Sequence, residues 1–456
     1  MTTQVARPAL PVGVLPPPPA VEPLTLQDLE EAWLALSPDE RREGFTLLSR
    51  EDAEELFGDL STRDQAQLIR RLPEREARLW MRHLAPDDAA DVVQEAEEEE
   101  ERARLVSLLD PASRREVQAL LAYEEDVAGG LMSPRFARVR PDMTADEALS
   151  YLRRQARGKV ETVYYAYVLD AGQHLLGVAS FRELFAASPE ALVRDVMERD
   201  VEVVAEGMDQ ESVSRLFVER GLLAMPVIDA DGRMKGVITV DDIVDVVEEE
   251  ATEDIQKVGG TEALDQPYVE AGFKERVSKR AGWLTVLFLG QMLTTTAMSA
   301  FQDQIASALV LALFLPLIIS SGGNTGSQAC TLIIRSLALG EVRLSDWWRV
   351  FRRELVTGLA LGLLLGVIGF VRVVAWDAVS PTYGPHAALI GVTIGLSLVG
   401  VVLWGSLAGA MLPFLLRRLG ADPASASAPF VATLIDVTGV VLYFSVASAV
   451  LSGSLL

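Results

Sequence analysis

Residues 429–453 read PFVATLIDVTGVVLYFSVASAVLSG, an apolar run that contains a single carboxylate, Asp436. As a helix, this run is long enough to cross about 30 Å of hydrocarbon. A carboxylate at the depth of Asp436 costs about 3 kcal/mol or more, so it normally faces a water-filled path or a cationic partner. An intramembrane salt bridge is the alternative, but no Lys or Arg lies deep in the apolar segments of the chain. The sequence therefore predicts an ion or proton pathway beside Asp436.

Five such apolar stretches follow Arg280, and each is long enough to span a bilayer. They cover residues 281–301, 306–334, 355–375, 387–415 and 429–453. Lys and Arg gather before the first stretch, between the second and third, and between the fourth and fifth, which places these sides in the cytoplasm. We expect a multi-pass protein of the cytoplasmic (inner) membrane, with its N-terminus in the cytoplasm and its C-terminus outside. Among these stretches, Asp436 is the one acidic residue expected well inside the membrane.

The second stretch holds glycines and polar residues in close succession, Gly322-Gly323-Asn324-Thr325-Gly326-Ser327-Gln328, shortly after Pro316. We expect this segment to interrupt the helix, and an interruption must face protein or water because its backbone polar groups cannot face lipid. Oxygen-bearing side chains beside glycines suit a hydrated hard cation. Close packing of small residues between helices is an alternative that stays open.

Charge divides the chain near residue 273. Residues 1–273 hold 57 Asp and Glu against 29 Lys and Arg, whereas residues 274–456 hold 8 against 12. The acidic front argues against nucleic-acid binding, which uses Lys and Arg to neutralise phosphates, and favours cations as partners. The single cysteine, Cys330, excludes a disulfide within the chain and a cysteine-based metal site.

The acidic front begins with a Pro-rich tail, residues 1–24, which lacks an apolar signal-peptide core and is expected to be disordered. From Leu36 onward, helix-start signals recur about every dozen residues, as in Ser37-Pro38-Asp39 and Ser49-Arg50-Glu51. Short helices on a fixed period bury their apolar faces by stacking on one another. Residues 25–128 are therefore predicted to form an all-α superhelical domain.

Residues 132–255 form an internal repeat in which apolar strands flank an Asp/Gly turn, at Asp170-Ala171-Gly172 and again at Asp229–Gly232. The repeat resembles a tandem pair of CBS domains, the β-α-β-β-α module of cystathionine β-synthase, over residues 132–194 and 195–255. This resemblance implies that Thr239 and Asp242 hydrogen-bond the ribose of a regulatory nucleotide such as ATP. Capping of the following helix by Thr239 explains the same residues without a ligand.

The order of these parts resembles the MgtE family of magnesium channels over residues 25–456. The motifs that carry the resemblance are Gly322–Gln328, Leu412-Pro413-Phe414 with Arg417–Pro423 just after it, and Asp436-Val437-Thr438-Gly439. It implies a multidomain fold: an all-α N domain, α/β tandem CBS domains, a connecting helix called the plug over residues 256–280, and a polytopic α-helical pore domain with five transmembrane helices over residues 281–456.

The same resemblance implies a homodimer through the CBS and transmembrane domains, with a pore on the two-fold axis and Asp436 of both subunits as the selectivity site. Magnesium sheds its water reluctantly, so a partly hydrated ion between two facing carboxylates makes physical sense. The other predicted pore residues are Gly322, Gly323, Asn324, Thr325 and Thr433.

Eight carboxylates lie between Asp241 and Asp254, just before the first apolar stretch. We expect cytoplasmic Mg²⁺ to bridge such acidic faces and to press the connecting helix against the pore, which would close it. A solvated run of charges is the alternative. Positions in the family similar to Glu250, Glu253, Asp254 and Asp422 bind regulatory magnesium, and the predicted metal ligands also include Asp242, Asp245 and Asp436.

Two other classes of protein remain open. One is a membrane-anchored CBS sensor of nucleotides, and the other is a less selective transporter of Co²⁺, Mn²⁺ or Ni²⁺. An enzyme is not expected, because His83, His174 and His386 fall in three different regions of the chain. The sequence also has no P-loop, so passage is expected down the electrochemical gradient rather than by ATP-driven pumping.

Overall fold

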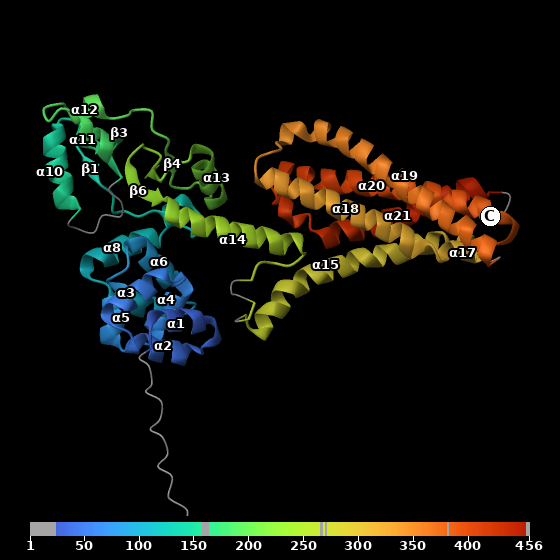
Figure 1. Cartoon of the computed structure of the whole chain (residues 1–456), viewed down its shortest axis with the longest axis horizontal. Helices are drawn as coiled ribbons and strands as arrows, with labels where there is room; N and C mark the ends of the chain where they lie inside the picture. The colour runs from blue at the N-terminus through green and yellow to red at the C-terminus, as the bar shows by residue number, and fades with distance from the viewer. Residues whose placement is uncertain (1–23, 157–163, 265–267, 270, 381–382, 453–456) are drawn as a thin grey trace, which may run out of the picture. The chain divides into compact units, whose positions relative to one another are not determined.

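The computed structural model of the chain describes residues 24–156, 164–264, 268–269, 271–380 and 383–452. The chain forms two compact units, Met1–Val246 and Val247–Leu456. Figure 1 draws the first unit in blue to green and the second in yellow to red. The tail predicted to be disordered lies outside the described residues, apart from Leu24.

Short helices build the first part of the first unit, as the recurring helix-start signals predicted. Their bounds are α1 Leu26–Ala32, η1 Trp33–Ala35, α2 Pro38–Leu47, α3 Arg50–Asp59, α4 Thr62–Arg71, α5 Glu74–Met81, α6 Pro86–Gln94, α7 Glu99–Leu108 and α8 Pro111–Leu120. The hydroxyl groups of Ser37, Ser49 and Ser61 each accept a hydrogen bond from the backbone N–H three residues later, which satisfies one free donor at the start of α2, α3 and α4.

The helical domain is held together by an aromatic cluster and a buried arginine. The Trp80 ring lies 5.1 Å from that of Phe45 and 4.8 Å from that of Phe57, measured between ring centroids. Arg41 donates to the Trp33 carbonyl and forms a 2.8 Å ion pair with Asp64, which ties α2 to α4. The stacking of short helices around one core confirms the all-α prediction.

Two β-α-β-β-α repeats complete the first unit and confirm the CBS pair. The first comprises β1 Arg138–Val139, α10 Ala145–Gln155, β2 Tyr165–Leu169, β3 Leu175–Ser180 and α11 Phe181–Ala186. The second comprises β4 Val204–Ala205, α13 Gln210–Arg220, β5 Ala224–Ile228, β6 Met234–Thr239 and α14 Val240–Val258, and two short helices, α9 Ala128–Leu131 and α12 Val193–Val196, flank the repeats. In each sheet the first strand pairs parallel with the second, which pairs antiparallel with the third. Tyr167 of one sheet and Val237 of the other share a buried cluster, so the repeats pack on each other.

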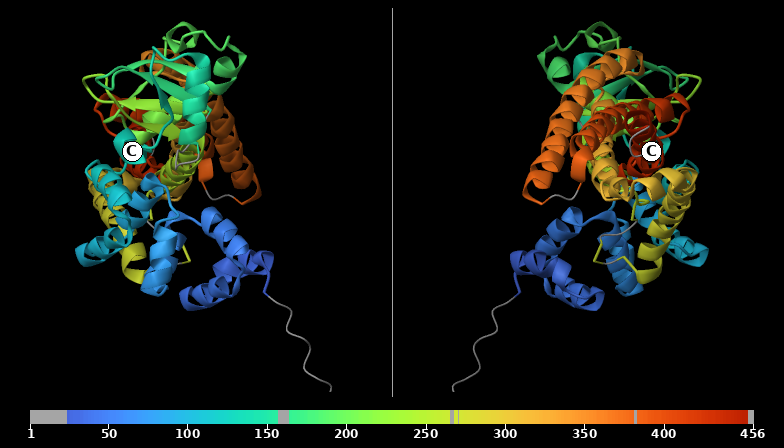
Figure 2. Two further views of the ribbon diagram at one scale, coloured as in Figure 1. Left: turned by 90° about the vertical axis from the view of Figure 1, so that its left-hand side faces the viewer. Right: turned by 90° about the vertical axis from the view of Figure 1, so that its right-hand side faces the viewer.

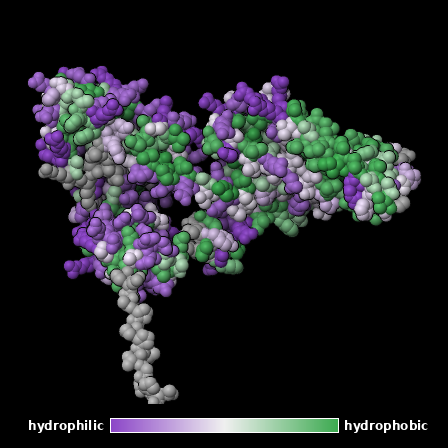
Figure 3. All heavy atoms as spheres, viewed as in Figure 1, coloured by the Kyte–Doolittle hydropathy of each residue, from purple (hydrophilic) through white to green (hydrophobic). Residues whose placement is uncertain are grey.

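The second unit consists of long apolar helices. They are α15 Phe273–Ala300, α16 Gln302–Ser307, α17 Leu309–Ala312, α18 Leu315–Ala338, α19 Trp347–Val379, α20 Ala387–Arg418 and α21 Ala428–Leu451, with 3-10 turns η2 Leu344–Asp346, η3 Gly384–His386 and η4 Pro423–Ser425. Five helical segments among the described residues are long and apolar enough to cross a membrane. Figure 3 shows hydrophobic side chains gathered on the surface of these helices. The five predicted spans are present, each with somewhat different bounds.

The expected interruption of the second span is wrong, because α18 runs unbroken through Gly322–Gln328. Pro316 lies in the first turn of α18, where the N–H that proline lacks has no partner within the helix. The glycines serve close packing instead: a Cβ atom on Gly326 would collide with Ile435 of α21, and one on Gly405 of α20 would overlap the carbonyl oxygen of Gly322. Figures 1 and 2 show α18, α20 and α21 lying side by side.

The connecting helix expected over residues 256–280 is not one helix in the described part of the chain. The last helix of the second CBS repeat, α14, continues to Val258. It ends before Gly260, whose φ of 77° is readily adopted by glycine and rarely by other residues. The next helix, α15, begins at Phe273 and continues without a break into the first span.

Candidate ion pathway and regulatory carboxylates

Asp436 lies in the first half of α21, the helix predicted from the apolar run of residues 429–453. Ser427 begins this helix by accepting a hydrogen bond from the Phe430 N–H. Ile435 and Val440 are fully buried, whereas Asp436 is only half-buried. The helix therefore buries one side among its neighbours and keeps the carboxylate of Asp436 near the edge of the bundle.

The first span supplies a neighbour of Asp436 that the sequence did not predict. The Gln291 side chain of α15 is a hydrogen-bonding partner of the Asp436 carboxylate. Contacts on both sides set the position of α15 along α21: the Trp283 indole N–H donates to Ser427 Oγ at 2.9 Å, and the Phe301 ring stacks on that of Phe444 at 5.3 Å. The sequence does carry a signal for this contact, because Gln291 is the one residue of α15 with a carboxamide side chain.

The predicted pore residues near α18 divide into exposed and packed groups. The Asn324 side chain is exposed. The Thr325 hydroxyl is buried and donates to the Ser321 carbonyl within the same helix. Gly322 and Gly323 are buried, Gly322 in close contact with α20 and α21 and Gly323 beside α21. Thr433 donates to Pro429 O, and its methyl group leaves room only for a glycine at position 290 of α15.

Glu354 lies near the beginning of a membrane-spanning helix and makes a contact that the sequence did not predict. Glu354 belongs to α19, which begins at Trp347, earlier than the predicted third span. The buried Ser406 hydroxyl of α20 donates to the Glu354 carboxylate at 2.5 Å. This bond supplements the contact that α19 makes with α20 through Gly358, Gly362 and Gly366.

The predicted regulatory residues Glu253 and Asp422 meet in the second unit, with a lysine between them. Lys257 Nζ lies 2.6 Å from Glu253 Oε1 and 2.8 Å from Asp422 Oδ2. Partial burial alone would lower the pKa of Lys257, but the two carboxylates outweigh it and raise the pKa above its ordinary value. Glu250 and Asp254 lie half-buried on the same part of α14.

The end of α14 is fastened to the membrane-spanning helices just after this lysine. Val258 packs against the main apolar cluster of the second unit. A Cβ atom on Gly260 would lie 3.0 Å from both Pro429 and Trp283, so the chain passes close to the start of α21 and to the first half of α15. The Glu262 N–H donates to the Lys279 carbonyl of α15 at 3.0 Å.

The other predicted metal ligands, Asp242 and Asp245, lie in the first unit at the start of α14. Burial raises the pKa of Asp242 to about 7, and the nearby charges of Asp241 and Asp88 add to the increase. Asp88 belongs to α6 of the helical domain and also interacts electrostatically with Asp245. Carboxylates from the helical domain and the second CBS repeat are therefore close enough to repel one another when ionised.

The predicted nucleotide contacts Thr239 and Asp242 bind each other. The Thr239 hydroxyl and backbone N–H both donate to Asp242 Oδ2, at 2.7 and 3.2 Å. Ser180 and Glu183 form the same arrangement at the start of α11 in the first repeat. At Thr239 the bond from the backbone N–H to Asp242 is one half of a capping box, which Ser180 and Glu183 form completely. Both capping by Thr239 and the ribose contact stay predictions.

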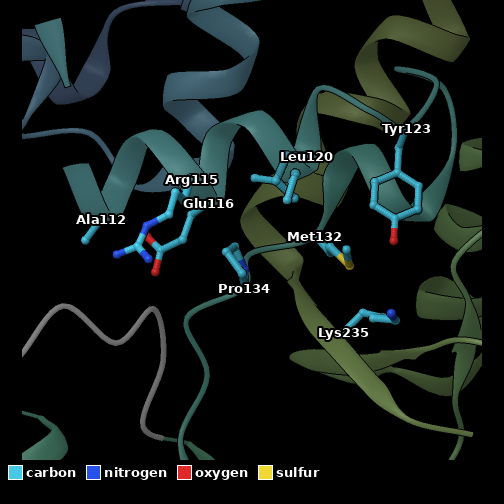
Figure 4. Close-up of a pocket in the computed structure, with 9 residues that line it drawn as sticks. Ala112, Arg115, Glu116, Leu120, Tyr123, Met132, Pro134 and Lys235 are labelled. Carbon is cyan, nitrogen blue, oxygen red and sulfur yellow. The ribbon is translucent and has the colours of Figure 1, made fainter. Parts of the chain in front are cut away.

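A pocket of about 430 Å³ lies within the first unit, between α8 and β6 (Figure 4). The polar side chains on its wall are engaged: Glu116 pairs with Arg135, Tyr123 donates to Glu206, and Lys235 pairs with Asp229. Among the residues that the structure describes, no group of three or more His, Cys, Asp or Glu side chains is arranged to hold a metal ion. The predicted metal ligands are thus spread over several places rather than collected in one preformed site.

Comparison with known proteins covers both the first unit and most of the membrane-spanning helices. Residues 315–446 match a family described as a divalent cation transporter, MgtE, residues 24–126 match the MgtE intracellular N domain, and residues 126–190 and 193–249 match CBS domains. The magnesium transporter MgtE of Thermus thermophilus is 46% identical over 367 residues, which cover 80% of this chain and 79% of that protein. The chain belongs to the MgtE family.

Other MgtE proteins match over similar lengths. The magnesium transporter MgtE of Enterococcus faecalis is 36% identical over 73% of this chain and 71% of its own. A crystal structure of the cytosolic domain of the Mg²⁺ channel MgtE in complex with ATP covers 49% of this chain and 91% of that one, with 41% identity and a TM-score of 0.46. The MgtE assignment confirms the predicted family and places the chain in a family of transporters rather than enzymes.

Proposed function

We propose that this chain is the subunit of a magnesium channel in the cytoplasmic membrane, through which Mg²⁺ moves down its electrochemical gradient past Asp436. The observation that carries the proposal is a half-buried carboxylate on an apolar spanning helix, beside the amide of Gln291. Such a carboxylate within a membrane helix is costly unless it serves a hydrated path. The names of the two relatives above support magnesium as the ion.

The proposal includes a homodimer with Asp436 of both subunits facing the pore. Magnesium keeps much of its water and binds through few direct ligands, so a pair of carboxylates can hold it through its hydration shell. A dication gains twice the Coulomb energy that a monovalent ion gains at the same distance. Two carboxylates therefore favour divalent over monovalent ions, and Gln291 and Asn324 add amide oxygens and N–H groups to the path.

Closure of the channel by cytoplasmic Mg²⁺ is the second part of the proposal. The carboxylates assigned to it are Asp242 and Asp245 in the first unit and Glu250, Glu253, Asp254 and Asp422 in the second. The Lys and Arg clusters that flank the spans support a cytoplasmic location of these residues and of the N-terminus. Bound Mg²⁺ would neutralise the acidic residues along α14 and hold its end against the start of α21.

Flux into proteoliposomes tests the pore. We expect Asp436→Ala to abolish Mg²⁺ uptake, and Asp436→Asn to reduce it by at least about tenfold, because the amide lacks the charge that attracts the ion. Glu341→Gln removes an exposed carboxylate between α18 and α19 and should leave uptake unchanged. Undiminished uptake by folded Asp436→Ala protein would refute the pore assignment, and no uptake by folded wild-type protein would favour the anchored sensor. Competition with Co²⁺, Mn²⁺ and Ni²⁺ in the same vesicles ranks the ions.

A nucleotide is proposed only as a regulatory ligand of the CBS pair. Because Thr239 and Asp242 already satisfy each other, a ribose would have to replace a 2.7 Å hydrogen bond. Titration of the wild-type full chain and of its Thr239→Val variant with ATP measures whether a nucleotide binds. It also shows whether binding depends on the Thr239 hydroxyl group.

A further inference from the structure

Lys257 lies between two carboxylates that the proposed function assigns to regulatory magnesium. Its ammonium group contacts Glu253 on its own helix and Asp422 in the turn that follows α20, at 2.6 and 2.8 Å. About 28% of the lysine side chain and slightly more than a third of each carboxylate side chain are exposed, so the cluster is screened from bulk water only in part. The position of a cation between the two acidic groups is thus already filled by the protein itself.

We propose that Lys257 acts as a tethered cation that competes with the regulatory divalent ion for Glu253 and Asp422, and so sets the Mg²⁺ concentration at which the channel closes. This inference rests on the proposed function, in which these carboxylates hold regulatory Mg²⁺. In the absence of the ion, the ammonium group neutralises part of the charge. Magnesium must displace it to gain direct contact with both acids.

The coordination of Asp422 explains why displacement is needed. One carboxylate oxygen, Oδ1, accepts the Ala424 N–H at 2.8 Å and caps the turn η4. The other, Oδ2, contacts Lys257. A divalent ion binds carboxylate oxygens directly or through its water. At Asp422 Oδ2 it would be repelled by the ammonium group of Lys257, which lies 2.8 Å from that oxygen. Of the two contacts, the ion pair with the flexible lysine is the one that can be exchanged without undoing a backbone turn.

Displacement of Lys257 by Mg²⁺ would occur close to α21, the helix that carries Asp436. Asp422 lies six residues before the first residue of α21, the helix of Asp436. Directly after Lys257, Val258 and Gly260 contact the membrane-spanning unit, Gly260 beside Pro429 of α21. Replacing a single positive charge by a dication therefore alters the attachment of α14 to the helix that carries the proposed selectivity site.

The test compares the inhibition of uptake by Mg²⁺ on the cytoplasmic face of proteoliposomes made with the full chain. Lys257→Gln removes the competing charge while keeping a similar side-chain length, and we expect the half-inhibiting Mg²⁺ concentration to fall by about twofold to fivefold, as for loss of a partly exposed ion pair. Lys257→Arg keeps the charge and can pair with carboxylates through two N–H groups, so its value should equal or exceed that of the wild type. Lys274→Gln, which removes an exposed lysine from the start of α15, should have no effect.

A second readout is the hydrogen exchange of residues 250–264, which should become protected at a lower Mg²⁺ concentration in Lys257→Gln than in the wild type. An unchanged or higher half-inhibiting concentration in Lys257→Gln would overturn the inference, since it would mean that the ion pairs act only as a structural latch. If Lys257→Gln does not fold, the Lys257→Arg variant still tests the inference. A half-inhibiting Mg²⁺ concentration that is lower in Lys257→Arg than in the wild type would also overturn it. Wild-type protein that cytoplasmic Mg²⁺ fails to inhibit would instead refute the proposed gating, so the two failures can be told apart.

Discussion

At the scale of the residue, Asp242 makes the stability of the α14 start depend on pH. Burial raises its pKa from 3.8 to about 7, so the fold favours the neutral acid. The neutral Asp242 side chain makes its full contribution to the free energy of unfolding below about pH 4, and this contribution is lost as the pH rises to about 7. We expect Asp242→Asn, which can still accept the hydrogen bond from Thr239, to remove this decline and to stabilise the start of α14 by about 1–3 kcal/mol at pH 8.

Native-state hydrogen exchange of the α14 start in the full chain, measured without divalent ions between pH 5 and 8, checks the Asp242 prediction. Asp200→Asn is a suitable control because Asp200 is exposed in a loop before β4. Equal pH dependence in wild type and Asp242→Asn would show that Asp242 is ionised across the whole range.

At the scale of the element, the packing of α20 on α18 depends on glycines that face each other. A Cβ atom on Gly409 would overlap the carbonyl oxygen of Gly326, and this contact involves backbone that cannot turn away. Gly409→Ala should therefore destabilise the membrane unit by about 1–3 kcal/mol, as overpacking does elsewhere. Gly400→Ala, in the same helix, meets open space within 4 Å and should be neutral or slightly stabilising.

Thermal unfolding of the two glycine variants in the same detergent measures this difference. A loss of stability that is equal in both variants would mean that helix propensity, rather than contact with α18, accounts for the effect. Uptake by surviving Gly409→Ala protein should also fall, because α18 carries Asn324 and contacts α21 through Gly326.

At the scale of the whole molecule, we expect the acidic charge of residues 1–273 to make the stability of this part of the chain depend on divalent ions. The eight carboxylates between Asp241 and Asp254 extend from one compact unit into the other along α14. We expect millimolar Mg²⁺ to slow hydrogen exchange in α14 and α6, and a ligand at 100 times its dissociation constant stabilises by about 2.7 kcal/mol. NaCl of the same ionic strength should protect far less. Equal protection by both salts would indicate general screening rather than bound Mg²⁺.

Elements with strong local signals could be predicted from the sequence. Ser37, Ser49 and Ser61 announce helix starts because capping depends on residues close in the chain. The five spans follow from the length of their apolar runs. The glycines of α18 predict a break that the structure does not contain, because a single sequence does not reveal the neighbouring helices that make a glycine-rich helix stable.

The amino-acid sequence by itself determined the family, the order of the domains, the five spans and the position of Asp436, because each depends on local pattern and composition. Tertiary structure alone decided which side chains meet across distance. It placed Gln291 beside Asp436, Ser406 beside Glu354, and Lys257 between Glu253 and Asp422. These pairs join residues from different helices and turns, and their contacts arise from the packing of whole helices, which no local rule of spacing or periodicity contains.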